Sequence, residues 1–265
     1  MSTWVIQSNL IDPVQISQIV DACNEQGLPY VGVQVLPFIE DIKFLTEEPT
    51  HEFCIPYGST KLVRLAQTRD WKGVFFDREK FRVDTWNANR SDMLNDDAEV
   101  MLVAELRNKF ETIADDEVYF IRPVEDLKAF NGTVTTAKEI RHWMSSVDSG
   151  NFSFDENTPV IVARPKNILA EWRWFIVGGK IISGSTYRMH KQRLVQRETD
   201  RDVIKEAQEL ADGWLPHDVC VMDVALIEGS PLPKVIEFNC FNSSGFYYHD
   251  ISAIVKAATK YTDWS

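Results

Sequence analysis

The sequence predicts an α+β protein in which a small α/β layer comes first and a unit rich in antiparallel hairpins follows. Over residues 4–110, strand and helix signals alternate. From residue 117 onward, apolar strands are joined by turns of glycine and proline. The polar segment 108–117 lies between the two patterns, so we expect two domains, residues 1–112 and 113–265.

The elements of the first part follow from capping and turn signals. A helix begins at Asp12-Pro13 and ends at Gly27, because proline favours the first helical position and glycine the residue after the last. Gly58 and Ser59 are placed to cap a further helix. The remaining expected elements are strands at residues 4–7, 30–35, 52–55 and 74–76 and an amphipathic segment at 96–110.

The second part contains one strong helix signal and two hairpins. Thr136 and Glu139 have the spacing of a capping box, and one hairpin turns at Gly178-Gly179. The expected elements are strands at 117–123 and 158–165, hairpins over 170–188 and 219–239, and helices from 136, over 200–213 and over 251–261.

The composition argues against several classes of function. The formal net charge is -12, from 28 Lys and Arg against 40 Asp and Glu, so broad nucleic-acid binding through phosphates is not expected. No apolar run approaches the length of a membrane span, and the first residues lack a basic leader, so we expect a soluble cytoplasmic protein. The cysteines show no CxxC pairing, which indicates a reducing compartment without a zinc site or disulfide framework. They are Cys23, Cys54, Cys220 and Cys240. The oligomeric state is not predicted.

The last hairpin concentrates oxygen ligands. With its turn centred near Ser230, Asp223 lies opposite Glu237, and Asn239 shares their face because side chains alternate along a strand. Like charges directly opposite destabilise a sheet, whereas a divalent cation such as Mg²⁺ would reverse that effect. The alternative is a solvated face on which the carboxylates pair with lysines such as Lys234.

The middle of the chain is basic, although the chain as a whole is acidic. On the strand 170–177, Glu171 and Arg173 share one face, while two tryptophans face the core. Arg122 ends its strand beside a glycine-containing loop that carries Lys128, which is typical of phosphate-binding loops. The alternative for each arginine is an ordinary surface ion pair, such as Glu171 with Arg173 or with a cross-strand neighbour. Together, a basic set and an acidic set predict the two halves of a magnesium–nucleotide site.

The order of these motifs resembles an ATP-grasp ligase. The motifs are a small α/β domain, a strand ending in Arg122-Pro123, a glycine-containing loop, a hinge strand, a hairpin beginning with Glu171, and an Asp strand followed by Glu-x-Asn. Arg122-Pro123 and Glu171-Trp172-Arg173 look most like one clade, named for two arginines and a lysine. That clade includes the eukaryotic assembly factor for translation initiation factor 2 and many bacterial and phage proteins. The resemblance covers residues 117–262 and implies an ATP-grasp fold preceded by a pre-ATP-grasp domain.

The resemblance implies a nucleotide site with ATP as its ligand. Arg122 and Lys128 would hold the phosphates, and Lys128 would also be catalytic. The backbone around Ala163 and Arg164 would pair with adenine, and Ile168 would cover the ring.

The resemblance also implies the residues around the reacting phosphate. Glu171 would accept from the ribose hydroxyls, and Arg173 would be catalytic, reaching the γ-phosphate or the acyl phosphate. The metal ligands would be Asp223, Glu237 and Asn239, binding one or two Mg²⁺.

The implied activity is an ATP-dependent carboxylate-amine ligase. A substrate carboxylate attacks the γ-phosphate to form an acyl phosphate, which an amine then attacks, and the protein neutralises the charge that develops. The substrates would be an amino acid, a peptide or a protein. One alternative is an ATP-binding assembly or modification factor that grips a protein partner. Adenylation with release of AMP is a third possibility, but the sequence shows no convincing nucleophilic lysine motif for it.

Two loops are candidates for the acceptor site. In "PYGSTK", Gly58 would allow close approach and Ser59 would offer a hydroxyl, unless the segment is simply a helix cap. In "NSSGFYYHD", Asn242 and Ser243 would lie near the acyl group with His249 as acid or base, and helix capping is again the alternative.

Overall fold

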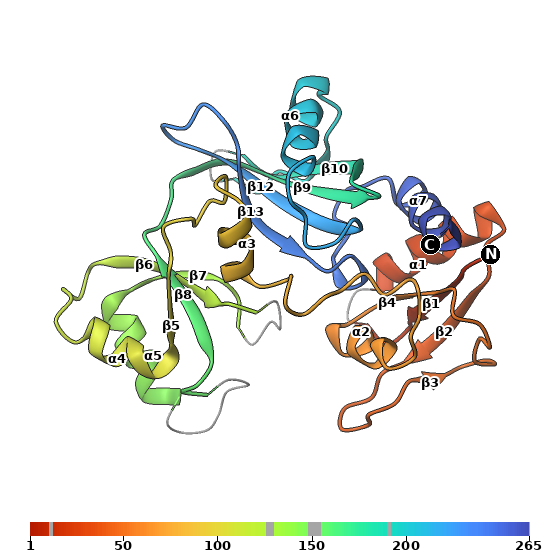
Figure 1. Cartoon of the computed structure of the whole chain (residues 1–265), viewed down its shortest axis with the longest axis horizontal. Coiled ribbons are helices and arrows are strands. Elements are labelled where there is room, and N and C mark those ends of the chain that lie inside the picture. Colours follow the sequence, from red (N-terminus) through yellow and green to blue (C-terminus); the bar gives the residue numbers. More distant parts are fainter. Residues whose placement is uncertain (11–12, 126–129, 148–154, 190–191, 265) are drawn as a thin grey trace.

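The computed structural model describes residues 1–10, 13–125, 130–147, 155–189 and 192–264. These residues form three sheets, with strand orders β3-β2-β1-β4, β5-β8-β6-β7 and β11-β10-β9-β12-β13 (Figure 1). The five-stranded sheet lies across the top of that view, and the other two lie below it on opposite sides. The mixture of helix and strand is the α+β class that the sequence predicts.

The first sheet is the small α/β layer. Its parallel strands are β1 (Thr3–Gln7), β2 (Tyr30–Gln34) and β4 (Cys54–Tyr57), and the short antiparallel strand β3 (Lys43–Phe44) lies at its edge. Helices α1 (Pro13–Gln26) and α2 (Thr60–Gln67) follow β1 and β4. Ser59 is the N-cap of α2, as predicted, and accepts from the Leu62 N–H at 3.3 Å. The predicted alternation of strand and helix is therefore confirmed up to α2.

The segment after α2 differs from the prediction. Residues 74–76 are not a strand, although Phe75 is fully buried. The Phe75 N–H donates to the Asn242 side chain at 2.8 Å, so it has no need of a strand partner. Helix α3 (Val83–Asn89), which the sequence did not predict, follows. The predicted amphipathic segment 96–110 is then divided between β5 (Glu99–Leu102) and α4 (Val103–Phe110), which follows it directly.

The second sheet is antiparallel throughout. It contains β5, β6 (Val118–Pro123), β7 (Thr133–Thr136) and β8 (Pro159–Ala163), and α5 (Ala137–Val147) packs beside α4. The predicted capping box is present: Glu139 Oε2 accepts from the Thr136 N–H at 2.9 Å, and the Glu139 N–H donates to Thr136 Oγ1 at 3.2 Å. Elements β5 and α4 precede the predicted boundary at residues 112 and 113, yet they pair and pack with β8 and α5, which follow it. The boundary itself stays a prediction.

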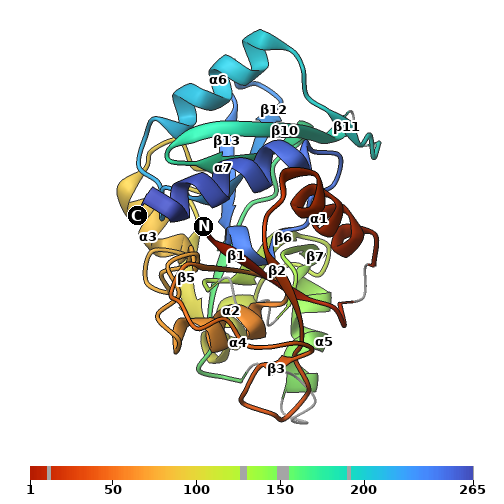
Figure 2. The same cartoon turned by 90° about the vertical axis from the view of Figure 1, so that its right-hand side faces the viewer.

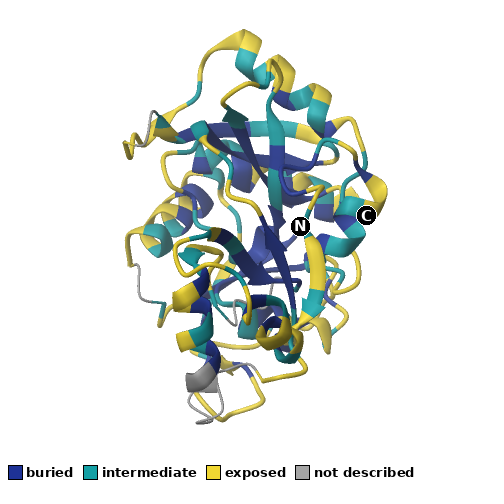
Figure 3. Ribbon diagram, turned by 90° about the vertical axis from the view of Figure 1, so that its left-hand side faces the viewer, coloured by how far each residue is buried: buried dark blue, intermediate teal, exposed yellow. Residues whose placement is uncertain are grey.

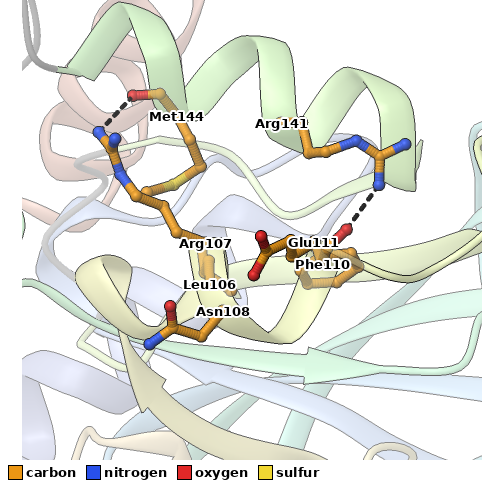
Figure 4. A pocket seen from close by; sticks show the side chains of 7 residues that line it. All are labelled: Leu106, Arg107, Asn108, Phe110, Glu111, Arg141 and Met144. Carbon is orange, nitrogen blue, oxygen red and sulfur yellow. Dashed lines mark hydrogen bonds between the residues drawn. The ribbon is translucent and has the colours of Figure 1, made fainter.

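Arginine side chains join the two helices on the outer side of this sheet. Arg107 donates to the Met144 carbonyl at 3.5 Å, and Arg141 donates to the Phe110 carbonyl at 2.6 Å (Figure 4). The cavity between the helices has a volume of about 340 Å³, and Glu111 also lines it. Both bonds satisfy carbonyls at helix ends, which indicates that these arginines hold the two helices together.

The third sheet is built from two long hairpins. Strands β9 (Ile168–Val177) and β10 (Lys180–Met189) turn at Gly178 and Gly179, whose φ angles of +60° and +70° suit glycine. The second hairpin is β12 (Cys220–Ile227) and β13 (Lys234–Asn239), and the edge strand β11 (Gln196–Arg197) completes the sheet. Helices α6 (Arg201–Ala211) and α7 (Ile251–Trp264) and the short 3₁₀ helix η1 (Phe241–Ser243) complete the chain.

The two faces of the five-stranded sheet bury different cores. Trp172 and Trp174 face a core that includes residues of α3 and α6, as the alternation predicted. Phe175 and Val221 face the opposite core, which includes residues of β1, α1 and α7. Helix α7 lies beside α1, so the first and last helices form one layer (Figure 2). Buried residues are therefore concentrated along the central strands (Figure 3). Within the described ranges, no helix has the length and apolar character that a membrane span requires.

Candidate active site

Three charged residues lie in one row across neighbouring strands. Arg173 on β9 pairs in register with Asp223 on β12, and Asp223 pairs with Glu237 on β13. Directly opposed residues of antiparallel strands project from the same face, so the three side chains meet. The predicted register of Asp223 against Glu237 is confirmed.

Two ion pairs and an amide hold this row together, and one of the two pairs reaches the second sheet. Arg173 binds Asp223 in a bidentate manner, with Nε to Oδ1 at 2.8 Å and Nη2 to Oδ2 at 2.6 Å. Arg122 on β6 donates from Nη1 to Glu237 Oε2 at 2.5 Å. Asn239 Nδ2 donates to Asp223 Oδ2 at 3.2 Å and to Glu237 Oε1 at 3.3 Å. The basic and acidic sets that the sequence placed far apart therefore converge.

The alternative of a solvated acidic face is wrong. Asp223 is 2% exposed, and Lys234 pairs instead with Asp96 at 3.3 Å. Arg173 is also buried, with 9% exposed. A buried bidentate pair of this kind has far more geometric order than a surface ion pair.

Burial and mutual proximity set the ionisation of the site. Burial raises the pKa of Asp223 to about 6 against the opposing effect of Arg173, and the nearby Glu237 raises it further. Burial also acts to raise the pKa of Glu237, but the charges of Arg122 and Arg173 outweigh it and lower that pKa. The pKa of Arg173 is raised, because the attraction of Asp223 outweighs burial. The two arginines thus favour the ionised form of both carboxylates.

The donor set fits a divalent cation that also holds phosphate. Two carboxylates and an amide oxygen on adjacent strands are hard ligands of the type that Mg²⁺ takes. Asp223, Glu237 and Asn239 supply them, and the two arginines beside them suit phosphate oxygens. In the described part of the chain, no group of three or more His, Cys, Asp or Glu side chains is placed to hold a metal ion.

The predicted phosphate loop is described only in part. Arg122 lies over the Trp86 ring, with its guanidinium carbon 5.5 Å from the ring centroid, and its Nε donates to the Pro123 carbonyl at 3.2 Å. Lys128, predicted to act from this loop, lies outside the described residues. Its role stays a prediction.

The predicted adenine-binding residues lie on either side of the link between two sheets. Ala163 ends β8 and pairs with Phe120, while Ile168 begins β9. The Arg164 side chain points to Glu117, and Arg164 Nη2 lies 2.8 Å from Glu117 Oε2. The link therefore joins the second sheet to the five-stranded sheet, as expected for a hinge, but its contact with adenine stays a prediction.

Glu171 is engaged within the protein. Its carboxylate accepts from Arg188 Nη1 at 2.6 Å, and this arginine is its cross-strand neighbour on β10. The Tyr187 hydroxyl also bonds to Glu171; burial and the charges of Asp223 and Glu171 raise the pKa of Tyr187. The cross-strand ion pair that was the predicted alternative is therefore present, with Glu171 buried and the Arg188 side chain 49% exposed.

The loop after β13 caps helix α7, as the alternative predicted, because Asp250 Oδ1 accepts from the Ala253 N–H at 3.0 Å. The proximity of Asn242 and Ser243 to the acyl group stays a prediction. Asn242 caps no helix: its Nδ2 donates to the Pro56 and Gly73 carbonyls at 2.7 and 2.8 Å, and its Oδ1 accepts from Phe75. His249 lies against Ser183, with Nδ1 and Oγ 3.1 Å apart. Burial, together with nearby arginine charge, lowers the pKa of His249 to about 3, so the ring is neutral at physiological pH and cannot act there as a cationic acid.

Sequence reasoning missed the aromatic residues around Arg173. The Tyr247 ring lies 4.7 Å from the Arg173 guanidinium carbon and stacks on Tyr187 at 5.5 Å. The Gly245 carbonyl accepts from Arg173 Nη1 at 3.4 Å. The adjacent tyrosines in "GFYYHD" were the available sequence signal. An irregular loop has no periodicity, however, from which the direction of their side chains could be predicted.

Comparisons with known proteins agree with this fold. An ATP-grasp domain family, described as family 3 of the R-two-K clade, matches residues 69–257. The chain therefore belongs to the ATP-grasp superfamily, within that family of the clade. A search of curated proteins finds no match.

Solved structures share the fold at low sequence identity. The D-cycloserine synthetase DcsG is 11% identical, with a TM-score of 0.59, covering 98% of this chain and 100% of that one. The RimK domain ATP-grasp protein from Sphaerobacter thermophilus DSM 20745 is 10% identical, with a TM-score of 0.59 and coverage of 98% and 99%. The ATP-grasp ligase PsnB, complexed with a minimal precursor, is 11% identical, with a TM-score of 0.52 and coverage of 98% and 99%. These likenesses show that the ATP-grasp fold extends over nearly the whole chain.

Proposed function

We propose that this protein is an ATP-dependent carboxylate-amine ligase that acts on an amino acid or peptide. The observation that carries the proposal is the convergence of Arg122 and Arg173 with Asp223, Glu237 and Asn239. Cations that bind phosphate and oxygen ligands that bind Mg²⁺ are the two requirements of a magnesium–triphosphate site. The proposal also draws support from the synthetase DcsG and the precursor-binding ligase PsnB, which share the fold.

The proposed reaction has two steps. An oxygen of the substrate carboxylate forms a bond to the γ-phosphorus of ATP, the bond from that phosphorus to ADP breaks, and an acyl phosphate results. The amine nitrogen then attacks the acyl carbon, loses a proton, and releases phosphate. The products are an amide or peptide bond, ADP and phosphate.

The chain's own residues bind and orient the reacting groups in this proposal. Arg122 and Lys128 hold phosphate oxygens, and Arg173 faces the transferring group. Asp223, Glu237 and Asn239 hold Mg²⁺, which when bound neutralises charge on the phosphates.

The ion pairs of the site imply an exchange of partners when the nucleotide and cation bind. Arg173 and Arg122 now bind the same carboxylates that are proposed to bind the cation. When the carboxylates take the cation, the guanidinium groups become available to phosphate, so charge stays balanced in both states. This exchange explains how buried arginines and buried carboxylates serve one ligand.

The nucleotide end of the site forms part of the same proposal. The backbone around Ala163 and Arg164 pairs with adenine, Ile168 covers the ring, and Glu171 accepts from the ribose. For Glu171, this requires that Arg188 share or release the carboxylate. We also propose a cytoplasmic location, which the four buried cysteines, none of them in a disulfide bond, support.

Release of ADP and phosphate from Mg-ATP with pooled amino acids tests the proposal. Asp223→Asn keeps the side-chain shape but removes the charge, and we expect turnover to fall by about 10²- to 10³-fold, the usual loss for one preorganised electrostatic group. The matched control is Asp96→Asn, which removes an exposed carboxylate that pairs with Lys234.

Two results would contradict the proposal. The first is near-normal turnover by folded Asp223→Asn protein, which would remove the metal assignment. The second is tight ATP binding by the unaltered protein with no product from any amino acid or peptide, which would favour an ATP-binding assembly factor.

A further inference from the structure

The Arg173 guanidinium is held from three directions. Asp223 binds one edge through Nε and Nη2, and the Gly245 carbonyl accepts from Nη1. The Tyr247 ring covers one face, with its centroid 4.7 Å from the guanidinium carbon. A guanidinium group carries five N–H donors in a fixed plane, so these contacts leave only a limited set of donors for an anion.

Tyr247 adopts a backbone conformation that a tyrosine rarely takes. Its φ angle is +43°, in the left-handed region, and the side chain is 43% exposed. Its ring stacks on Tyr187 of β10, with the planes 23° apart. Exposure means that burial of the ring does not account for this strained conformation, and strain of this kind concentrates at functional sites.

The neighbouring residues of the loop explain how this conformation is maintained. The Phe246 ring lies between Phe175 at 5.2 Å and Tyr57 at 4.9 Å. The Tyr57 hydroxyl donates to the Ser244 carbonyl at 2.5 Å. A residue of the first sheet, Tyr57, therefore fixes the loop from one side, and Phe175 of β9 fixes it from the other.

We propose that Tyr247 is a positioning residue: its ring holds the Arg173 guanidinium so that the remaining N–H donors face the γ-phosphate. This inference rests on the proposed role of Arg173. Asp223 is a proposed cation ligand as well as a partner of Arg173, so the ion pair alone cannot fix the guanidinium in the ligand-bound state. The ring contact does not compete with a cation and is available in both states.

The proposal predicts a specific binding defect. The affinity ratio of Mg-AMPPNP to Mg-ADP, measured by calorimetry on the full chain, reports contact with the γ-phosphate. Tyr247→Leu should lower this ratio by between about twofold and thirtyfold, the range that cation–π contacts span. Tyr247→Phe keeps the ring and should keep the ratio.

The adjacent tyrosine provides a matched control. Tyr248 is 63% exposed, and its ring stacks on no other ring among the described residues. Tyr248→Leu should therefore leave the ratio unchanged. In ligand-free protein, the Arg173 Nε–H resonance should lose its ring-current shift in Tyr247→Leu and retain it in Tyr248→Leu.

The outcomes separate this inference from the proposed function. If Arg173→Ala leaves the ratio unchanged, Arg173 does not contact the γ-phosphate and both proposals about it fall. If Arg173→Ala lowers the ratio and Tyr247→Leu does not, the positioning role alone is wrong. Equal losses in Tyr247→Leu and Tyr248→Leu, or a loss in Tyr247→Phe as large as in Tyr247→Leu, would also overturn it. A shift in the ratio confined to Tyr247→Leu supports it.

Discussion

Asn242 is the residue whose replacement should most clearly weaken the junction between the first sheet and the loop after β13. Its side chain is fully buried and bonds to three backbone groups: the Phe75 N–H and the carbonyls of Pro56 and Gly73. Its own carbonyl accepts from the Gly58 N–H at 2.9 Å. Asn242→Ala removes the three side-chain bonds and keeps the last one.

The loss in free energy of unfolding follows from the number of buried backbone groups that Asn242→Ala leaves without partners. Each buried backbone group that loses its partner costs about 1–3 kcal/mol, so three such groups cost at least about 3 kcal/mol. For a chain of this size that corresponds to a drop in Tm of roughly 6–12 °C, taking about 2–4 °C per kcal/mol. Asn242→Asp keeps the volume and the acceptor but cannot donate when ionised, so it should also destabilise by about 2 kcal/mol or more.

Thermal and urea unfolding of the variants would measure these losses. Ser243→Ala is the matched control, since Ser243 is the next residue and, among the residues that the structure describes, only its backbone makes a hydrogen bond. It should change the free energy of unfolding by less than about 0.5 kcal/mol, as is usual for such sites. An Asn242→Asp protein as stable as the unaltered chain would refute the hydrogen-bond reasoning.

Two further predictions concern packing and pH. A Cβ atom added at Gly184 would lie 2.0 Å from the Trp174 ring, which is 1% exposed and has no space to move, so Gly184→Ala should lower the free energy of unfolding in urea by about 1–3 kcal/mol. Bonds from the Thr136 N–H and from the Thr136 and Thr135 hydroxyls lower the pKa of Glu139 from 4.5 to about 2. Because the folded pKa is the lower one, the stability that this cap contributes is complete above pH 4.5 and is lost as the pH falls toward 2. In unfolding experiments over this range, Glu139→Gln should be less sensitive to pH than the unaltered chain, and equal sensitivity would contradict the assignment.

The acidic half of the site could be predicted because it depends on local geometry. In a hairpin, the turn fixes which residues oppose one another, so Asp223 and Glu237 follow from the position of the turn. Asn239 follows from the alternation of side chains along a strand, which also places Arg173 on the same face as Glu171. That Arg122 would reach Glu237 from another sheet required the family resemblance, because no local pattern reports on a contact 115 residues apart.

Other features depended on packing that no local pattern describes. Strand β7 follows directly after a glycine and runs straight into a capping box, so its residues gave a stronger signal for the helix start than for a strand. Residues 74–76 have the composition of a strand, but their backbone bonds to Asn242 instead. Tyr247 and Asn242 lie in irregular segments whose partners come from elements far apart in the chain, and propensity does not identify such partners.

The core beneath the first sheet has a consequence for how the chain folds during synthesis. Trp4 packs there with Ala258 of α7, and its indole N–H donates to Thr259 Oγ1 at 2.9 Å, across 255 residues of sequence. Strand β1 therefore leaves the ribosome long before the helix that covers its apolar face. Because segments so far apart in the chain close this core, we expect folding to finish slowly and to depend on chaperones.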